Sequence, residues 1–182
     1  TGATTVTVKN SDAADFTFDV PSYNGLAENK AGKDANITIE NVFTDITGDK
    51  NAVGETVSKS KLRNTAIFAD GFKADIYGQN GYYPLLANET YEKVKTGIVT
   101  ESVNDENAKI TNTSDSAKSA YVVIGYYNNG DMVNANVAGE KTIQAGASEN
   151  ISITKPANCK LVKVFVFNSA SDISPLNYAI EY

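Results

Sequence analysis

Hydrophobic and polar positions alternate with a period of two along much of the chain. In residues 4–8, 16–20 and 37–43, β-branched and aromatic residues occupy one parity and mostly polar residues the other. This alternation is typical of strands with one buried face. Runs rich in Asn, Asp, Gly and Pro separate the segments, as turns require. The pattern predicts an all-β fold.

Two segments in the C-terminal part are apolar on both parities, namely residues 121–127 (YVVIGYY) and 161–167 (LVKVFVF). Strands covered on both faces have this composition, so we expect the two segments to be paired core strands. An Asn-Asn-Gly-Asp turn at residues 128–131 leads from the first of them into a strand over residues 132–137. Ile151 and Ile153 alternate with polar residues in a further strand, and residues 177–182 are expected to form a last one.

The middle of the chain is less regular. Asp70-Gly71 is a two-residue hairpin signal and predicts a hairpin between residues 64–69 and 72–77. Asn88 can cap a helix that Gly97 ends, with Glu89 and Lys93 four residues apart on one face. We therefore expect at most one short helix, over residues 88–97.

The polar stretch Asn-Asp-Glu-Asn at residues 104–107 predicts a domain boundary. It divides the chain into a β-rich domain of residues 1–107, which is a candidate sandwich with a ligand face, and a small sandwich of residues 108–182. A loop within one larger sandwich is the alternative. The length of 182 residues fits either reading.

Composition excludes several classes of function. The net charge is −6 and the lysines are scattered, so we expect no nucleic-acid partner. No apolar run approaches the roughly 20 residues of a membrane helix, so we expect no membrane span. The acidity, the richness in Thr, Asn, Ser and Gly, and a start at Thr1 that we interpret as processed all indicate a secreted or cell-surface protein.

The chain contains no histidine and a single cysteine. The usual activated Ser or Cys nucleophiles and His-based zinc sites are therefore excluded, and we expect Cys159 to be a small buried apolar group. Only a pair of facing carboxylates could support hydrolysis. Glu40 and Glu101 lie in strand-like surroundings, but surface charge explains them better. We expect no enzymatic activity.

A glycine-rich loop at residues 77–83 is the candidate carbohydrate site. Sugar rings pack their C–H faces on aromatic rings, and their hydroxyls need amide partners. The candidate binding residues are Tyr77, Gln79, Asn80, Tyr82 and Tyr83. The alternative is a hairpin loop whose tyrosine rings cap the core.

An acidic loop at residues 45–55 is the candidate metal site. It fails as an EF-hand loop, because Val53 and Ser60 occupy ligand positions. An irregular structural calcium site using Asp45, Asp49 and Glu55 remains, and a solvated acidic loop is the alternative. We expect no other cofactor.

The closing segment resembles a known kind of module. The run Val-Lys-Val-Phe-Val-Phe-Asn-Ser at residues 162–169 precedes Pro175-Leu176, and Gly146 stands before Ile151 and Ile153. The features of the preceding hairpin that match are Tyr126, Tyr127, Gly130, Met132 and Val133. Residues 108–182 are thereby similar to small immunoglobulin-like or fibronectin-like modules of exported clostridial and related bacterial proteins. Such modules commonly carry Trp-Asp where this chain has Phe167-Asn168.

The resemblance implies an immunoglobulin-like accessory sandwich and a position within a larger multi-module protein of the cell surface or of carbohydrate-active type. It does not indicate a ligand. Together with the tyrosine loop, it favours a non-catalytic extracellular module that binds a carbohydrate or a cell-surface glycan. The alternative is a structural or adhesive spacer with no small ligand.

Overall fold

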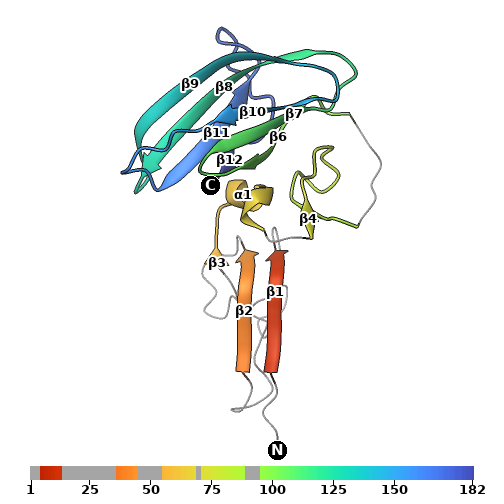
Figure 1. The fold of residues 1–182 in the computed structure, drawn as a ribbon, viewed down its shortest axis with the longest axis vertical. Helices are drawn as coiled ribbons and strands as arrows, with labels where there is room; N and C mark the ends of the chain where they lie inside the picture. Colours follow the sequence, from red (N-terminus) through yellow and green to blue (C-terminus); the bar gives the residue numbers. More distant parts are fainter. Residues whose placement is uncertain (1–4, 14–35, 45–54, 69–70, 89–94) are drawn as a thin grey trace, which may run out of the picture. The chain divides into compact units, whose positions relative to one another are not determined.

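The computed structural model describes residues 5–13, 36–44, 55–68, 71–88 and 95–182 (Figure 1). The chain divides into two compact units, Thr1–Leu62 and Arg63–Tyr182. In the described parts, helical structure is limited to one four-residue α-helix and one 3-10 turn, and the remaining elements are strands. The predicted all-β fold is confirmed.

The first unit contains a small sheet of order β1-β2-β3. Strands β1 (Thr5–Ala13) and β2 (Asn36–Thr44) run parallel, with Val6 opposite Ile37, and β3 (Glu55–Thr56) pairs with the end of β2. The short helix α1 (Lys59–Leu62) follows. The strands predicted over residues 4–8 and 37–43 are confirmed, whereas residues 16–20 lie outside the described part.

The second unit contains two antiparallel sheets, of order β10-β7-β6 and β12-β11-β8-β9, together with a two-stranded ribbon of β4 and β5. Figure 1 shows the long strands β8, β9 and β11 side by side. The strand bounds are β4 (Phe72–Lys73), β5 (Leu85–Leu86), β6 (Ile98–Val103), β7 (Asn107–Asn112), β8 (Lys118–Asn128), β9 (Asp131–Ile143), β10 (Ser148–Ser152), β11 (Leu161–Phe167) and β12 (Ile180–Glu181).

Both sheets contribute to a single hydrophobic core. In β11, Val162, Val164 and Val166 are buried and alternate with half-buried neighbours. Residues of β6, β7, β8 and β10 belong to the same cluster, and so does Cys159, whose predicted burial is confirmed. Each fully buried side chain of this size stabilises the fold by about 1.5–3 kcal/mol.

The pairing of the two apolar strands is confirmed, since β11 lies antiparallel to β8 with Val164 opposite Ile124. Strand β8 is central, between β11 and β9. Its second face is only half-buried, because Tyr121 and Val123 retain solvent exposure. At the β8–β9 turn, Asn129 and Gly130 both take positive φ. A two-residue hairpin turn needs this conformation so that its twist matches the twist of the two strands.

The polar stretch at residues 104–107 is the turn of the β6–β7 hairpin. The Asn104 side-chain oxygen accepts the N–H groups of Glu106 and Asn107 at 2.9 and 2.8 Å, as turn-forming asparagines do. Strands β6 and β7 belong to one sheet. The predicted boundary near residue 107 therefore does not separate two compact units, and the division falls after Leu62.

The predicted hairpin at Asp70-Gly71 is wrong. Residues Thr65–Ile67 form the 3-10 turn η1, and β4 pairs with β5 across a loop that begins at Ala74. The reason is Asn64, which is fully buried and accepts the Ala66 N–H at 3.1 Å as an N-cap. The helix predicted over residues 88–97 falls mainly outside the described residues.

Asn64 also joins two strands that belong to different sheets. Its side-chain nitrogen donates to the carbonyl oxygens of Val103 in β6 and Glu181 in β12, at 2.7 and 2.9 Å, and its oxygen accepts the Val103 N–H at 2.9 Å. All four hydrogen-bonding positions of the amide are thereby used. Asn64 fixes the position of the chain where it enters the second unit.

Candidate functional site

The loop that carries the predicted carbohydrate residues is organised by Asp75. This buried carboxylate accepts three backbone N–H groups: Gln79 at 2.9 Å on Oδ1, and Asn80 at 2.6 Å and Tyr82 at 3.0 Å on Oδ2. A buried charge needs such partners, and hydrogen bonds to a carboxylate are stronger than neutral ones. The loop is therefore wrapped around one side chain.

The tight curvature of the loop depends on three residues with positive φ, which are Gly78, Gly81 and Tyr82. At Gly78 a Cβ would also lie 2.9 Å from the Tyr82 ring. Only glycine satisfies both constraints there. A tyrosine at positive φ costs about 1–3 kcal/mol, and the hydrogen bond from Tyr82 to Asp75 helps to offset this cost.

The five predicted carbohydrate residues share this loop but not one cavity. Tyr82 is half-buried and lines a pocket. Tyr83 is buried, with 8% of its surface exposed, as expected for the alternative in which the rings cap the core. Gln79 and Asn80 are exposed, and Tyr77 is half-buried away from the pocket.

Arg63 links this loop to the segment that precedes β12. Its guanidinium lies over two tyrosine rings, 4.5 Å from the centroid of Tyr83 and 4.1 Å from that of Tyr178. Its Nε donates to the carbonyl oxygen of Gly81 at 3.2 Å. The ring of Tyr178 in turn meets the ring of Tyr82 edge to face at 5.6 Å. Cation–π contacts and the edge-to-face pair hold the rings together.

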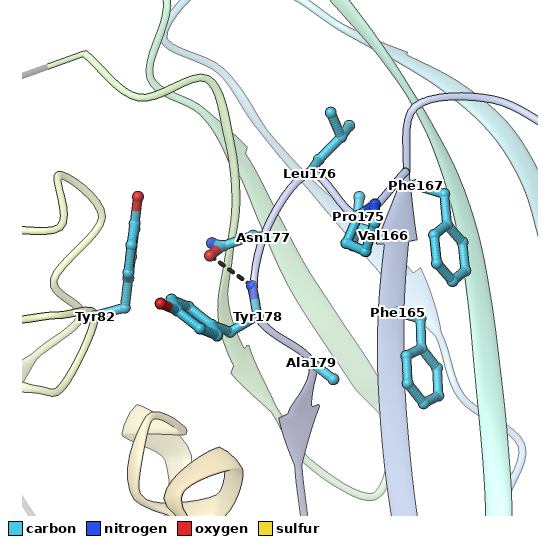
Figure 2. Close-up of a pocket in the computed structure, with 9 residues that line it drawn as sticks. All are labelled: Tyr82, Phe165, Val166, Phe167, Pro175, Leu176, Asn177, Tyr178 and Ala179. Carbon is cyan, nitrogen blue, oxygen red and sulfur yellow. Dashed lines mark hydrogen bonds between the residues drawn. The ribbon is translucent and has the colours of Figure 1, made fainter. Parts of the chain in front are cut away.

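A pocket of about 670 Å³ lies beside these rings, within the range of about 300–1,000 Å³ that small-molecule sites occupy. Figure 2 shows Tyr82 and Tyr178 near one another, and Asn177 beside them. The lining comes from three parts of the chain: the loop of Tyr82, strand β11, and the segment before β12. The residues are Tyr82, Phe165, Val166, Phe167, Pro175, Leu176, Asn177, Tyr178 and Ala179.

Asn177 is the amide in this lining. Its Oδ1 accepts the N–H of Tyr178 at 2.7 Å (Figure 2), and no described group binds its Nδ2. The lining thus combines aromatic faces with one amide donor and two phenol hydroxyl groups. Such a mixture suits a ligand with both C–H faces and hydroxyl groups.

The loop before the pocket wall is tied by Asp172. Its carboxylate accepts the Ser174 hydroxyl at 2.6 Å and the Asn168 amide at 2.8 Å. These hydrogen bonds, the one from Ser174 first, lower the pKa of Asp172 from its ordinary value. The following residues close onto β11, where the Leu176 N–H donates to the Val166 carbonyl oxygen at 2.9 Å. Asp172 thereby helps to place Pro175 and Leu176.

The candidate calcium ligands Asp45 and Asp49 lie outside the described residues. Glu55 is described, and it pairs with Lys61 at 3.2 Å. Among described side chains, no group of three or more His, Cys, Asp or Glu residues is placed to hold a metal ion. Nor does any described helix have the length and apolarity needed to cross a membrane.

The carboxylates considered for hydrolysis have different surroundings. Glu101 forms an ion pair with Lys109 at 2.7 Å and accepts the hydroxyl of Thr111. The side chain of Glu40 in β2 is outside the described part. Glu101 is therefore held by structural partners within its own sheet.

Sequence reasoning missed Arg63, Phe165, Phe167 and Tyr178. Phe165 and Phe167 lie in an apolar strand, a pattern that predicts a core position, and Arg63 and Tyr178 lie in short segments with no periodic pattern. Tyrosine next to an amide residue, as in Asn177-Tyr178, is similar to the combination of tyrosines and amides that marked residues 77–83. The sequence matches no protein-family model and no curated protein.

Proposed function

We propose that this chain is a non-catalytic binding module of a larger secreted or cell-surface protein, and that its pocket beside Tyr82 and Tyr178 holds a saccharide. The observation that carries the proposal is the lining of that pocket. Two tyrosine rings and an amide come together there from segments 95 residues apart, by the difference between positions 82 and 177.

The chemistry of the lining suits a sugar ring. The C–H face of a pyranose packs on an aromatic ring, and the phenol hydroxyls and the Asn177 amide can hydrogen-bond its hydroxyl groups. The rings are also held before a ligand arrives, Tyr82 by Asp75 and Tyr178 by Arg63. Preorganisation of this kind reduces the entropy lost on binding.

The accessory character of the C-terminal part is also proposed. Two antiparallel sheets that share one core support the resemblance of residues 108–182 to immunoglobulin-like modules. The compact unit begins earlier, at Arg63. The pocket therefore combines the resembling segment with residues that precede it.

A structural or adhesive spacer is the second candidate, and the edge strand β9 favours it. Met132, Val133 and Val137 expose large apolar side chains there, and β9 is the outermost strand of its sheet. Exposed apolar groups on a sheet edge are typical of contacts with another chain. Under this candidate no small ligand binds the pocket.

Affinity gel electrophoresis across a panel of neutral polysaccharides tests the proposal. We expect at least one polysaccharide to retard the parent chain, and Tyr82→Ala and Tyr178→Ala to abolish the retardation. Tyr77→Ala is the matched control, because Tyr77 belongs to the same loop but does not line the pocket. A parent chain that no saccharide retards or binds in solution would overturn the proposal and leave the spacer.

A further inference from the structure

We infer that the pocket selects acidic saccharides and that Arg63 binds the carboxylate of a uronic acid residue. The inference rests on the proposed saccharide site and adds the class of sugar. It starts from the guanidinium of Arg63, which lies against the ring of Tyr178 at the pocket wall.

The hydrogen-bonding capacity of Arg63 is only partly used. A guanidinium has five N–H donors, and Nε donates to the Gly81 carbonyl oxygen. Among described residues, no carboxylate forms an ion pair with Arg63, and no acceptor binds its terminal nitrogens. The lysines that form ion pairs show the contrast, as Lys109 does with Glu101 and Lys163 with Glu181.

The environment of Arg63 suits an oxyanion in the plane of the guanidinium. The rings of Tyr83 and Tyr178 lie against the guanidinium, so part of its surface is already out of water. The remaining N–H groups lie in the plane of the guanidinium, and a carboxylate in that plane can accept two of them in parallel. The bond from Nε to Gly81 fixes the orientation of that plane.

The position of Arg63 relative to the pocket indicates which class of sugar the pocket would select. Arg63 is not part of the pocket lining, but it contacts Tyr178, which is. The guanidinium of Arg63 lies 4.1 Å from the ring centroid of Tyr178, and the ring centroid of Tyr82 lies 5.6 Å from it. A sugar ring placed against Tyr178 therefore has a cation within reach of a substituent. In a hexuronic acid the carboxylate is attached directly to the ring, so it can extend past the edge of the tyrosine. A neutral hexose carries a hydroxymethyl group there and lacks the charge.

Titration calorimetry with an oligogalacturonate and with its methyl ester tests the inference. The two ligands share their sugar rings and differ in the charged group. We expect the parent chain to bind the acid about tenfold to a hundredfold more tightly than the ester, as for one charge-assisted hydrogen-bonded pair. Arg63→Gln should remove this preference, because the acid loses more affinity than the ester, which loses only the support that Arg63 gives to the Tyr178 ring. Lys118→Gln is the control, because it removes one exposed positive charge on β8.

The outcomes separate the two proposals. Equal affinity for acid and ester, or equal weakening of both in Arg63→Gln, would overturn the role of Arg63 and leave the saccharide site standing. A preference for dextran sulfate over the galacturonate would overturn the carboxylate assignment. If the parent chain binds neither galacturonate form nor any neutral saccharide, the proposed function itself fails.

Discussion

Asp75→Asn should release the loop that holds Tyr82. The carboxylate accepts three N–H groups, whereas an amide has one acceptor oxygen. If that oxygen faces Asn80 and Tyr82, the amide nitrogen faces the N–H of Gln79 and that hydrogen bond is lost. The other two bonds lose the contribution of the charge. The substitution therefore acts on the loop more than on the distant core.

The magnitude follows from these bonds. A hydrogen bond to a charged group contributes about 1.5–3 kcal/mol and a neutral one about 1 kcal/mol, so one lost and two weakened bonds cost about 4 kcal/mol. Gln79 is exposed, and water can replace the partner of its N–H, which lowers the cost to about 3 kcal/mol. A cost of this size raises the equilibrium constant for local opening of the loop about a hundredfold.

Amide hydrogen exchange measured by NMR checks this prediction. The N–H groups of Gln79, Asn80 and Tyr82 should exchange about a hundredfold faster in Asp75→Asn, as their shared acceptor weakens, while core amides of β8 keep their rates. Asp131→Asn makes the same change of charge at an exposed position and should leave all three rates unchanged. Unchanged exchange at these three amides in Asp75→Asn would refute the reasoning.

Three further predictions concern the fold. Asn64→Ala removes four hydrogen bonds at a fully buried site and should lower the free energy of unfolding by about 3–5 kcal/mol. Asn136→Ala, at an exposed position of β9, should leave the free energy of urea unfolding nearly unchanged, and similar losses in both variants would contradict the prediction. The pKa of Asp172 is lower in the folded than in the unfolded state. The charged carboxylate therefore stabilises the fold at pH values above its unfolded-state pKa, and this stabilisation is lost as the pH falls through its folded-state pKa. Ser174→Ala should raise the folded-state pKa of Asp172, measured by NMR titration of its carboxyl group. An ordinary pKa for Asp172 in the parent chain would refute this prediction. Gly125→Ala would place a Cβ 2.8 Å from the Tyr127 ring. We therefore expect the free energy of unfolding, measured in urea, to fall by about 1–3 kcal/mol. An unchanged free energy of unfolding would count against this prediction.

The strands that the sequence predicted best are those whose pattern depends only on burial. Residues 121–127 and 161–167 are apolar on both parities, and their pairing as β8 and β11 follows from that property. The turn at Asn129-Gly130 was equally predictable, because positive φ at two successive positions restricts the residue types. Local chemistry was sufficient in each case.

The predictions failed where tertiary contacts decide. Residues 64–69 alternate like a strand, but the buried amide of Asn64 binds β6 and β12 and caps a 3-10 turn instead. The polar residues 104–107 have the composition of a linker and also that of a tight turn, and sequence does not distinguish the two. Only the pairing of β6 with β7 does so.

The candidate site was half predictable. The tyrosines and amides of residues 77–83 marked one loop, and of these residues Tyr82 lines the pocket. The opposite wall of the pocket was not predictable, because the contact of Tyr178 with Tyr82 depends on tertiary structure: the pairing of β12 with β11 and the stacking of Arg63 on Tyr178. The burial of Tyr83 likewise depends on Arg63, which is 20 residues away by the difference of their positions.

The central claim is that a saccharide occupies the pocket between the Tyr82 loop and the segment before β12. Titration of the isotopically labelled parent chain with an oligosaccharide that binds it, followed through its backbone amide NMR signals, tests this claim directly. We predict that the largest shifts fall on Tyr82 and on residues 176–179, and that Tyr178→Ala abolishes them. Saturable shifts confined to other residues, such as the exposed face of β9, would contradict the claim.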